Sequence, residues 1–523
     1  MNATHELDSR DDFERAHSLS EEFMSSAYDT LRQRFSRISH LRDAQGMLEW
    51  DNQTMMPEGG AAARGEQLAT LSSLAHEMMT APDMADLLAA ATDDGTLSDW
   101  DKANVHEMKR SWRHSTAVEA RLVEALSIAG TRCNAIWRKA RPANDFASFA
   151  PALEEVMGLV REVAAQKAAA FGCDPYDALI DQFEPGMTAA SIAEVFAPLR
   201  EQLPTLIEEV LERQSQRMPG FEPVGPFSIA QQKELGLRVM KAIGFDFNHG
   251  RLDVSAHPFC GGIPTDVRLT TRYREDIWMP SLMGIVHETG HALYEQGLPR
   301  QWAGQPVGTA RSMAIHESQS LMWEMQIARS PAFITWLAPH VREVFEVSGA
   351  EWEASNLMTL AHRVERGLIR VDADEVTYPA HVLLRFGLEA DLVAGRLSVR
   401  DLPEAWRVGM LDLLGIEPDS DRNGCMQDIH WTDGSVGYFP SYTLGAMTAA
   451  QLAQTARQQV LELDEQLQEG EFGALLSWLQ THVHQKASLL STSELVVSAT
   501  GAPLSAEPFL AHLRQRYLQD AEA

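Results

Sequence analysis

Apolar residues recur every three or four positions along most of the chain, so the sequence predicts a mainly α-helical protein. The first such segment spans residues 21–48, and residues 50–57 are expected to end it, with a turn after Pro57. A composition rich in Ala, Leu, Glu and Arg supports the helices. The same spacing predicts further helices over residues 61–79, 81–99, 100–139, 146–171, 188–216 and 228–243.

The pattern changes after Phe245, where apolar and polar residues alternate with a period of two. Residues 252–255 and 267–271 show this alternation, and a stretch rich in Pro and Gly separates them. We therefore expect two strands of a small sheet, whose edge could hold an extended peptide by main-chain hydrogen bonds. Helical patterns return from residue 312, pause at 366–374 and at a Gly-rich aromatic stretch at 419–444, and resume over 448–517.

Composition and charge narrow the class of protein. The chain has 523 residues, of which 45% are hydrophobic, enough for a large core, and a formal charge of −30. This acidity argues against nucleic-acid binding. Four scattered cysteines fit a reducing compartment, the polar N-terminus lacks the features of a signal peptide, and no stretch is apolar enough to span a membrane. We therefore expect a cytoplasmic protein with a flexible N-terminal extension over residues 1–25.

The segment 283–294 introduces candidate chemistry, because it contains the motif His-Glu-x-x-His at His287, Glu288 and His291. On a helix the two histidines project from the same face and can hold one zinc ion, while Glu288 can activate a water on that ion. Gly290 indicates close packing against another segment. The alternative interpretation is two ordinary histidines on an amphipathic helix.

A third metal ligand must come from another element. Glu295 continues the spacing of the motif, but it lies about 12 Å along the helix axis from His287, too far for one ion. Glu317, on the next predicted helix, is the first candidate, and Glu324 is the second. Two His and one Glu leave a fourth position for water, which is typical of a catalytic zinc site.

Ordered motifs make the chain resemble a known family, the M32 metallocarboxypeptidases of the thermostable carboxypeptidase Taq type. The resemblance runs from about Ala27 to the C-terminus and includes a W-D-x-x-T-x-M-P pattern at 50–57. Cys260 and Ala487 depart from the family's expected residues, without affecting the active-site motifs. Beside the zinc motif, the matching segments are H-P-F at 257–259, D-x-R-x-T at 266–270, H-E-S-Q at 316–319, I-R-x-x-A-D at 369–374 and G-x-x-Q-D-x-H-W at 424–431.

The resemblance implies a large zincin-like helical fold with a deep groove and one small β-sheet beside the active site. Residues 26–523 would form a single catalytic domain with two helical lobes, usually assembled as a homodimer. The family releases single residues from peptide C-termini with broad specificity, using one zinc ion or sometimes cobalt. Its third zinc ligand is the Glu of H-E-S-Q, which is Glu317 in this chain.

An exopeptidase must also bind the free carboxylate at the end of its substrate, and the planar fork of arginine suits this task. Arg370, in the I-R-x-x-A-D motif, is the first candidate, and Arg268 is the alternative. Arg370 could instead form a surface salt bridge with a neighbouring acidic residue, and Arg268 could pair with Asp266.

Three further residues are candidates for contact with substrate. Tyr438 or His430 could donate to the developing oxyanion, although the aromatic residues of this stretch could equally form a packed core. His257 could contact substrate or merely order the turn between the strands. Two other functions remain open at this stage, a zinc oligopeptidase that cuts internal bonds and a non-catalytic helical zinc-binding scaffold.

Overall fold

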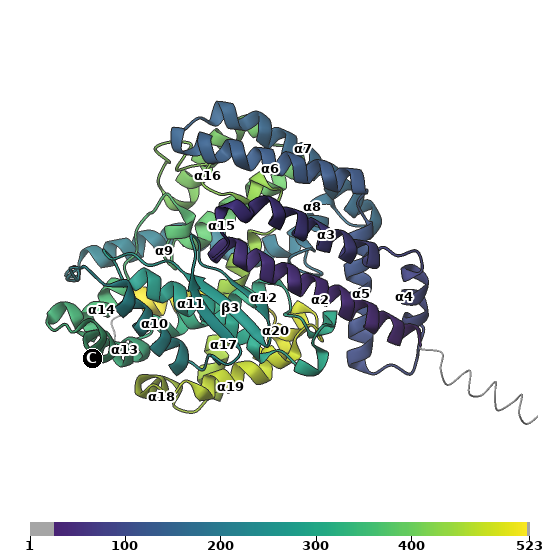
Figure 1. Cartoon of the computed structure of the whole chain (residues 1–523). Helices are drawn as coiled ribbons and strands as arrows, with labels where there is room; N and C mark the ends of the chain where they lie inside the picture. Colours follow the sequence, from purple (N-terminus) through teal and green to yellow (C-terminus); the bar gives the residue numbers. More distant parts are fainter. Residues whose placement is uncertain (1–25, 520–523) are drawn as a thin grey trace, which may run out of the picture.

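The computed structural model describes residues 26–519 as a largely helical protein with one small sheet, as the apolar spacing predicts (Figure 1). The expected N-terminal extension, 1–25, lies outside the described residues. The helices before the sheet are α2 (Ala27–Thr54), α3 (Ala61–Met79), α4 (Met84–Thr92), α5 (Asp99–Thr116), α6 (Ala120–Ala143), α7 (Phe146–Phe171), α8 (Pro175–Ile180), α9 (Ala189–Ser215) and α10 (Ile229–Ala242). Those after it are α11 (Met279–Gly297), α12 (Met313–Leu321), α13 (Pro331–Phe345), α14 (Ala354–Ala361), α15 (Tyr378–Val393), α16 (Leu402–Leu414), α17 (Pro440–Gln459), α18 (Leu463–Glu469), α19 (Gly473–His482), α20 (Thr492–Thr500) and α21 (Glu507–Leu518).

One long predicted helix is wrong. The segment 100–139 is not one helix, because α5 ends at Thr116 and α6 begins at Ala120. The break lets α5 pack in one apolar cluster with α2 and α4, while α6 packs in another against α7. The first helix ends at Thr54, within the segment 50–57 that was expected to end it, and Trp50 is buried near its end.

The sheet has three strands, β1 (Gly250–Val254), β2 (Cys260–Ile263) and β3 (Asp266–Thr271). The central strand β3 pairs in parallel with β1 and antiparallel with β2. The two strands with alternating sequence were predicted, whereas β2 was not, because its sequence Cys-Gly-Gly-Ile has no alternation. Gly262 has a φ of +113°, and a Cβ at this position would lie 2.1 Å from the carbonyl oxygen of Asp266.

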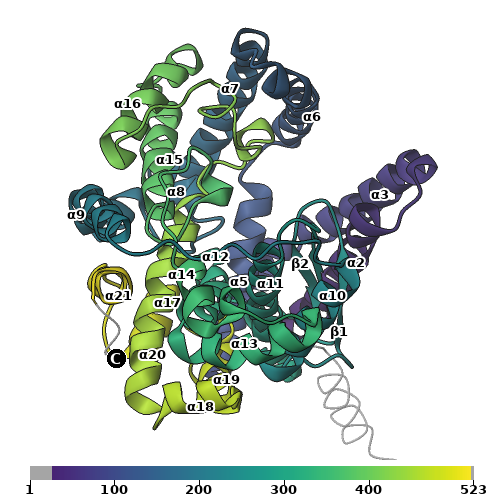
Figure 2. The same ribbon diagram turned by 90° about the vertical axis from the view of Figure 1, so that its left-hand side faces the viewer.

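Buried apolar side chains form three clusters. The smallest contains residues of the four helices from α2 to α5. The two largest share α17, since Leu444 and Met447 belong to one and Leu452 and Ala456 to the other. In Figure 2, α2 and α3 form an arm on the right, α6, α7 and α16 lie at the top, and α17 runs downward to the left of the centre. The sheet and α11 lie between the arm and α17.

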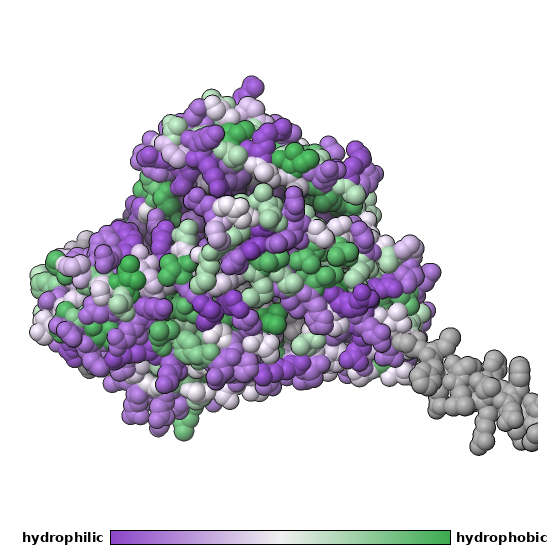
Figure 3. Space-filling model, in the orientation of Figure 1, coloured by the Kyte–Doolittle hydropathy of each residue, from purple (hydrophilic) through white to green (hydrophobic). Residues whose placement is uncertain are grey.

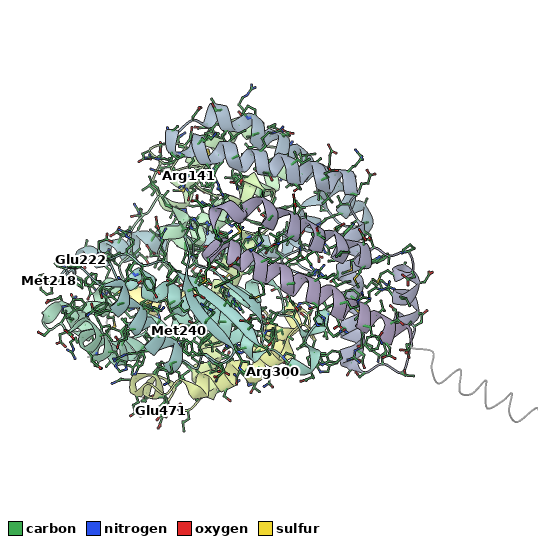
Figure 4. All side chains as sticks on the ribbon, viewed as in Figure 1. Arg141, Met218, Glu222, Met240, Arg300 and Glu471 are labelled. Carbon is green, nitrogen blue, oxygen red and sulfur yellow. The ribbon has the colours of Figure 1, made fainter. Side chains whose placement is uncertain are left out.

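The surface is polar with scattered apolar residues. Figure 3 shows hydrophilic and apolar patches interspersed over one face. Met218 is 82% exposed and lies with Glu222 at one edge of the molecule, in the segment between α9 and α10 (Figure 4). Across residues 26–519 there is no helix whose length and apolar character would let it cross a membrane.

Candidate metal centre and substrate pocket

The close approach of α11 and α12 creates the candidate metal site. A Cβ at Gly290 would lie 2.5 Å from the carbonyl oxygen of Gln319, so the backbones of the two helices are in contact there. At its start, α12 is fixed by Ser312, whose hydroxyl accepts from Ile315 N at 3.2 Å. Buried Glu184 also accepts from Ala314 N at 2.6 Å. This packing sets Glu317 opposite the histidines of α11.

Three predicted residues come together at this contact. Possible ligand atoms of His287, His291 and Glu317 all lie within 4.8 Å of one another. Glu317 Oε2 is 3.4 Å from His291 Nε2 and 3.9 Å from His287 Nε2. A carboxylate and two imidazoles are ligands that zinc accepts, and the three side chains are neither fully buried nor fully exposed. The donor set therefore fits a metal ion of the zinc type.

Glu324 contacts the opposite side of the His287 ring. Its Oε2 lies 2.9 Å from His287 Nδ1, while its Oε1 accepts from Arg329 Nη2 at 3.1 Å. Glu324 was the second candidate for the third ligand. It instead supports a candidate ligand from behind and leaves His287 Nε2 facing Glu317.

His291 has a similar support. Its Nδ1 lies 2.6 Å from His316 Nδ1, and His316 Nε2 lies 2.8 Å from Glu295 Oε1. Because an ionised carboxylate only accepts hydrogen bonds, His316 donates from Nε2. Glu295 is too far along the helix from His287 to bind the same ion. The structure places it behind His316, which in turn contacts His291.

The electrostatic environment favours a cation at this position. Burial lowers the pKa of His287, but Glu317 and Glu324 raise it more, to about 10. Burial raises the pKa of Glu317, but His287 and His291 lower it to about 2. Carboxylates that stabilise a protonated imidazole also stabilise a metal dication. Glu288, the candidate base, is 8% exposed, and burial raises its pKa to about 7.

Arg370 lies in a buried charge cluster rather than in a surface salt bridge. Its Nε and Nη2 donate to Asp428 Oδ1 at 3.0 and 2.9 Å. Arg385, which is fully buried, binds the other oxygen of Asp428 through Nε at 2.6 Å. Two guanidinium groups therefore share one carboxylate, and this trio carries one positive charge in excess.

Two tyrosine side chains contact Arg370 in this cluster. Arg370 Nη1 donates to the Tyr378 hydroxyl at 2.8 Å. Burial raises the pKa of Tyr378, and the Glu317 carboxylate raises it further, which places the two groups in one electrostatic environment. Tyr442 packs its ring 5.0 Å from the Arg370 guanidinium carbon. Tyr378 belongs to none of the sequence motifs.

Tyr438 and His430 lie beside the same tyrosines. Their rings stack with centroids 5.8 Å apart, and Tyr438 makes an edge contact with Tyr442 at 5.2 Å. Both residues are partly exposed. Burial raises the pKa of Tyr438, and Glu317 raises it further. The structure thus places both predicted oxyanion donors beside Tyr442, which packs against Arg370.

The two candidates from the sheet have other neighbours. Arg268 donates to both oxygens of Asp266 at 2.9 and 2.8 Å, and its guanidinium carbon lies 4.8 Å from the Trp50 ring. The pairing with Asp266 is the alternative that the sequence left open. His257 is exposed in the loop after β1, where its carbonyl oxygen accepts from the Ser255 hydroxyl.

Several residues with roles in this arrangement were not singled out from sequence. His316 and Asp428 both stood in recognised motifs, which was the available signal, but a motif does not say which atom a side chain contacts. Tyr378 had no such signal, because its place follows only from the three-dimensional position of Arg370.

Comparisons with known proteins agree on one family. The family model for the carboxypeptidase Taq (M32) metallopeptidases matches residues 30–517. Thermostable carboxypeptidase 1 of Thermus thermophilus is 39% identical over 504 residues, which cover 94% of this chain and 98% of the relative. Carboxypeptidase 1 of Bacillus subtilis is 33% identical and covers 92% and 96% of the two chains.

Solved structures lead to the same group. Metallocarboxypeptidase 1 of Trypanosoma cruzi superposes with a TM-score of 0.92 at 41% identity, covering 94% of this chain and 99% of that one. An M32 carboxypeptidase of Deinococcus radiodurans R1 gives a TM-score of 0.89 at 34% identity, with coverage of 94% and 98%.

Proposed function

The chain belongs to the carboxypeptidase Taq (M32) metallopeptidase family and is a metallocarboxypeptidase, and on this premise we propose which residues perform the reaction. His287, His291 and Glu317 hold one zinc ion, and Glu288 is the general base. The enzyme releases single residues from the free C-termini of peptides with broad specificity. The observation that carries the proposal is the convergence of the three candidate ligands beside Glu288, on two helices in backbone contact.

Zinc is the metal that best fits the site. Two imidazoles and one carboxylate leave a coordination position open, as in catalytic zinc sites. When bound, zinc lowers the pKa of a water molecule and polarises the carbonyl group of the scissile bond. Cobalt could replace it, because it accepts the same ligand types.

The residues around the ligands set the proton positions that metal binding requires. His291 must present the lone pair of Nε2, so its proton resides on Nδ1 and is donated to His316. His316 can accept there because it donates its own proton to Glu295. His287 donates in the same way from Nδ1 to Glu324.

Glu288 moves the proton of the reaction. It is nearly buried, and its raised pKa of about 7 suits a group that accepts and releases a proton near neutral pH. The carboxylate takes a proton from the attacking water and delivers it to the amine that leaves. Tyr438 or His430 donates to the oxyanion that develops on the carbonyl, since both lie beside Tyr442, which packs against Arg370.

Arg370 binds the substrate carboxylate. Buried charges in proteins are normally balanced, yet within residues 26–519 Arg370 and Arg385 form ion pairs with Asp428 alone. A substrate carboxylate beside Arg370 and Tyr378 would neutralise the remaining positive charge. Arg268 remains the alternative, although both oxygens of Asp266 already engage it. His257, exposed after β1, would contact substrate further from the cleaved bond.

A matched pair of peptides tests the proposal. We expect mass spectrometry to record a ladder losing one residue at a time from a peptide with a free C-terminus, and little cleavage of the same peptide with a C-terminal amide. A chelator should abolish the ladder, and zinc should restore it. Equal cleavage of both peptides at internal bonds would instead identify an oligopeptidase. Absence of cleavage by the zinc-loaded protein would favour a non-catalytic scaffold.

Three further properties complete the proposal. A cytoplasmic location is supported by the four cysteines, all of which are free.

A homodimer is supported by the family alone, and sedimentation at several concentrations would test it. A single catalytic domain over 26–523 with two helical lobes beside a deep groove is supported by the sharing of α17 between the two largest apolar clusters. One cooperative transition on unfolding would agree with it.

A further inference from the structure

We propose that Arg516, on the C-terminal helix α21, is a positioning residue that fixes the distance between the metal site and the carboxylate anchor. It does so by binding two segments at once, the turn that follows Glu324 and the segment between Arg370 and Tyr378. This inference rests on the proposed roles of the metal ligands and of Arg370.

On the metal side, Arg516 binds the main chain of a π-helical turn. The segment Met322–Ala328 is π-helical, a wider turn than an α-helix, and such turns are frequent at functional sites. Arg516 Nη1 donates to the carbonyl oxygen of Met325 at 2.5 Å, and Nη2 donates to that of Gln326 at 3.4 Å. These carbonyls directly follow Glu324, whose carboxylate contacts His287. Arg516 therefore binds the main chain next to Glu324, and Glu324 in turn contacts the proposed ligand His287.

On the anchor side, Arg516 binds Glu375. The Arg516 Nη1 atom lies 2.9 Å from Glu375 Oε2, which also accepts from the Tyr517 hydroxyl at 3.1 Å. Glu375 Oε1 contacts His512 Nε2 at 2.7 Å. Glu375 is 4% exposed and lies in the short segment that joins Arg370 to Tyr378. Residues of α21 thus hold the loop that carries the proposed anchor.

The helix has an apolar attachment that does not depend on Arg516. Phe509, Leu510, Leu513 and Tyr517 of α21 are buried, and α21 lies beside α17 in Figure 2. The buried guanidinium therefore adds a specific link to a helix that is already docked. Its planar fork can serve two partners, which a shorter or single-point donor does less well.

This link matters because a carboxypeptidase must hold two points of its substrate at a fixed separation. The carboxylate is bound at one point, and the carbonyl one residue earlier must reach the metal and Glu288. A misplacement of about 1 Å is enough to reduce a rate by roughly a hundredfold. Arg516 joins the supports of the two points through one side chain.

Three variants test this role. Arg516→Gln removes the charge and both links, whereas Arg516→Lys keeps a charge for Glu375. Arg514→Gln is the matched control, because Arg514 lies on the same helix but contacts Gln202 of α9. For Arg516→Gln we expect zinc to be lost to a chelator roughly tenfold faster and kcat on a peptide with a free C-terminus to fall roughly tenfold or more. Arg516→Lys should recover part of kcat, and Arg514→Gln should behave like the wild type.

Combination with Glu324→Gln separates positioning from general stability. If Arg516 acts through Glu324, its substitution should have little further effect on zinc release in the Glu324→Gln background. Additive effects on zinc release, or wild-type zinc release and kcat in Arg516→Gln, would overturn the inference. If Arg516→Gln does not fold, Glu375→Gln carries the same expectation for kcat, and a wild-type kcat would overturn it there. A wild-type protein that binds no zinc would instead contradict the proposed function.

Discussion

Glu295 accepts a hydrogen bond from Nε2 of His316 at 2.8 Å, and Nδ1 of the same ring lies 2.6 Å from Nδ1 of His291, a proposed zinc ligand. We expect His316→Phe to weaken zinc binding by roughly 10- to 100-fold, because His291 loses the partner that holds its proton on Nδ1. Glu295→Gln should have a smaller effect of the same sign. Competition with a chromogenic chelator measures both, and zinc affinity equal to that of the wild type in His316→Phe would refute the role.

Glu288→Gln should separate metal binding from catalysis. The amide keeps the size of the side chain but cannot accept a proton, so we expect bound zinc to stay at one per chain while kcat falls by about 10²- to 10⁴-fold. Metal analysis and peptide hydrolysis on the same preparation check this. A variant that retained full activity would exclude Glu288 as the base.

Substitutions of Arg370 and Arg268 can be distinguished by their effects on the preference for a peptide with a free C-terminus over one with a C-terminal amide. We expect Arg370→Met to lose on the order of 100-fold in kcat/KM for a free C-terminus and to reduce the preference over an amidated one, since a buried charge partner of the substrate is removed. Arg268→Met should retain the preference. The opposite pattern would assign the carboxylate to Arg268.

Gly290→Ala tests the contact between α11 and α12. The new Cβ would lie 2.6 Å from the Cα of Ser320, so the helices must separate, and we expect a loss of about 1–3 kcal/mol in stability together with weaker zinc binding. Gly284→Ala is the control on the same helix, because a Cβ there has no atom within 4 Å. Thermal unfolding and zinc affinity of the two variants should therefore differ. Equal behaviour would mean that the close approach is unimportant.

Lys167 gives a pH-dependent prediction away from the site. It is 7% exposed, and burial lowers its pKa to about 8, although its amine donates to Gln182 at 2.8 Å. The folded protein therefore binds fewer protons than the unfolded chain between about pH 8 and 10.5, and stability rises with pH across that window. Below pH 8 the Lys167 amine is charged in both the folded and the unfolded state, so its burial lowers the free energy of unfolding by the full amount, about 3 kcal/mol.

Lys167→Met removes this cost, so the variant should be more stable than the wild type at pH 7. The gain in stability is reduced by the loss of the hydrogen bond from Lys167 to Gln182. The difference should shrink as pH rises towards 10. Melting temperatures at pH 7 and 10 measure it, with the exposed Lys139→Met as control. A variant less stable than the wild type at pH 7 would contradict the prediction.

The sequence predicted those parts of the structure that depend on local spacing. The apolar period gave α3 and α7 with their observed bounds, and the spacing of His287 and His291 placed both on one face of α11. The division between α5 and α6 was not predictable in this way. It exists because the two halves of a continuous helical pattern pack into different apolar clusters, which only the tertiary structure determines.

The same distinction holds within the site. Motifs identified Glu317 and Arg370 as residues of interest, but not what surrounds them. Both Asp428 and Arg385 were needed to reveal the excess positive charge at Arg370, and they lie 58 and 15 positions away from it in sequence. Charge balance is a property of spatial neighbours, so no linear pattern reports it.

The contact between α11 and α12 also bears on the order in which the chain acquires its abilities. All three candidate metal ligands lie within residues 287–317, whereas the pair of Arg370 and Asp428 must close a loop of 58 residues. Local contacts form at a lower entropic cost than distant ones and so tend to form earlier in folding. A refolding chain should therefore bring the candidate metal ligands together before it forms the charge cluster proposed to bind the substrate carboxylate.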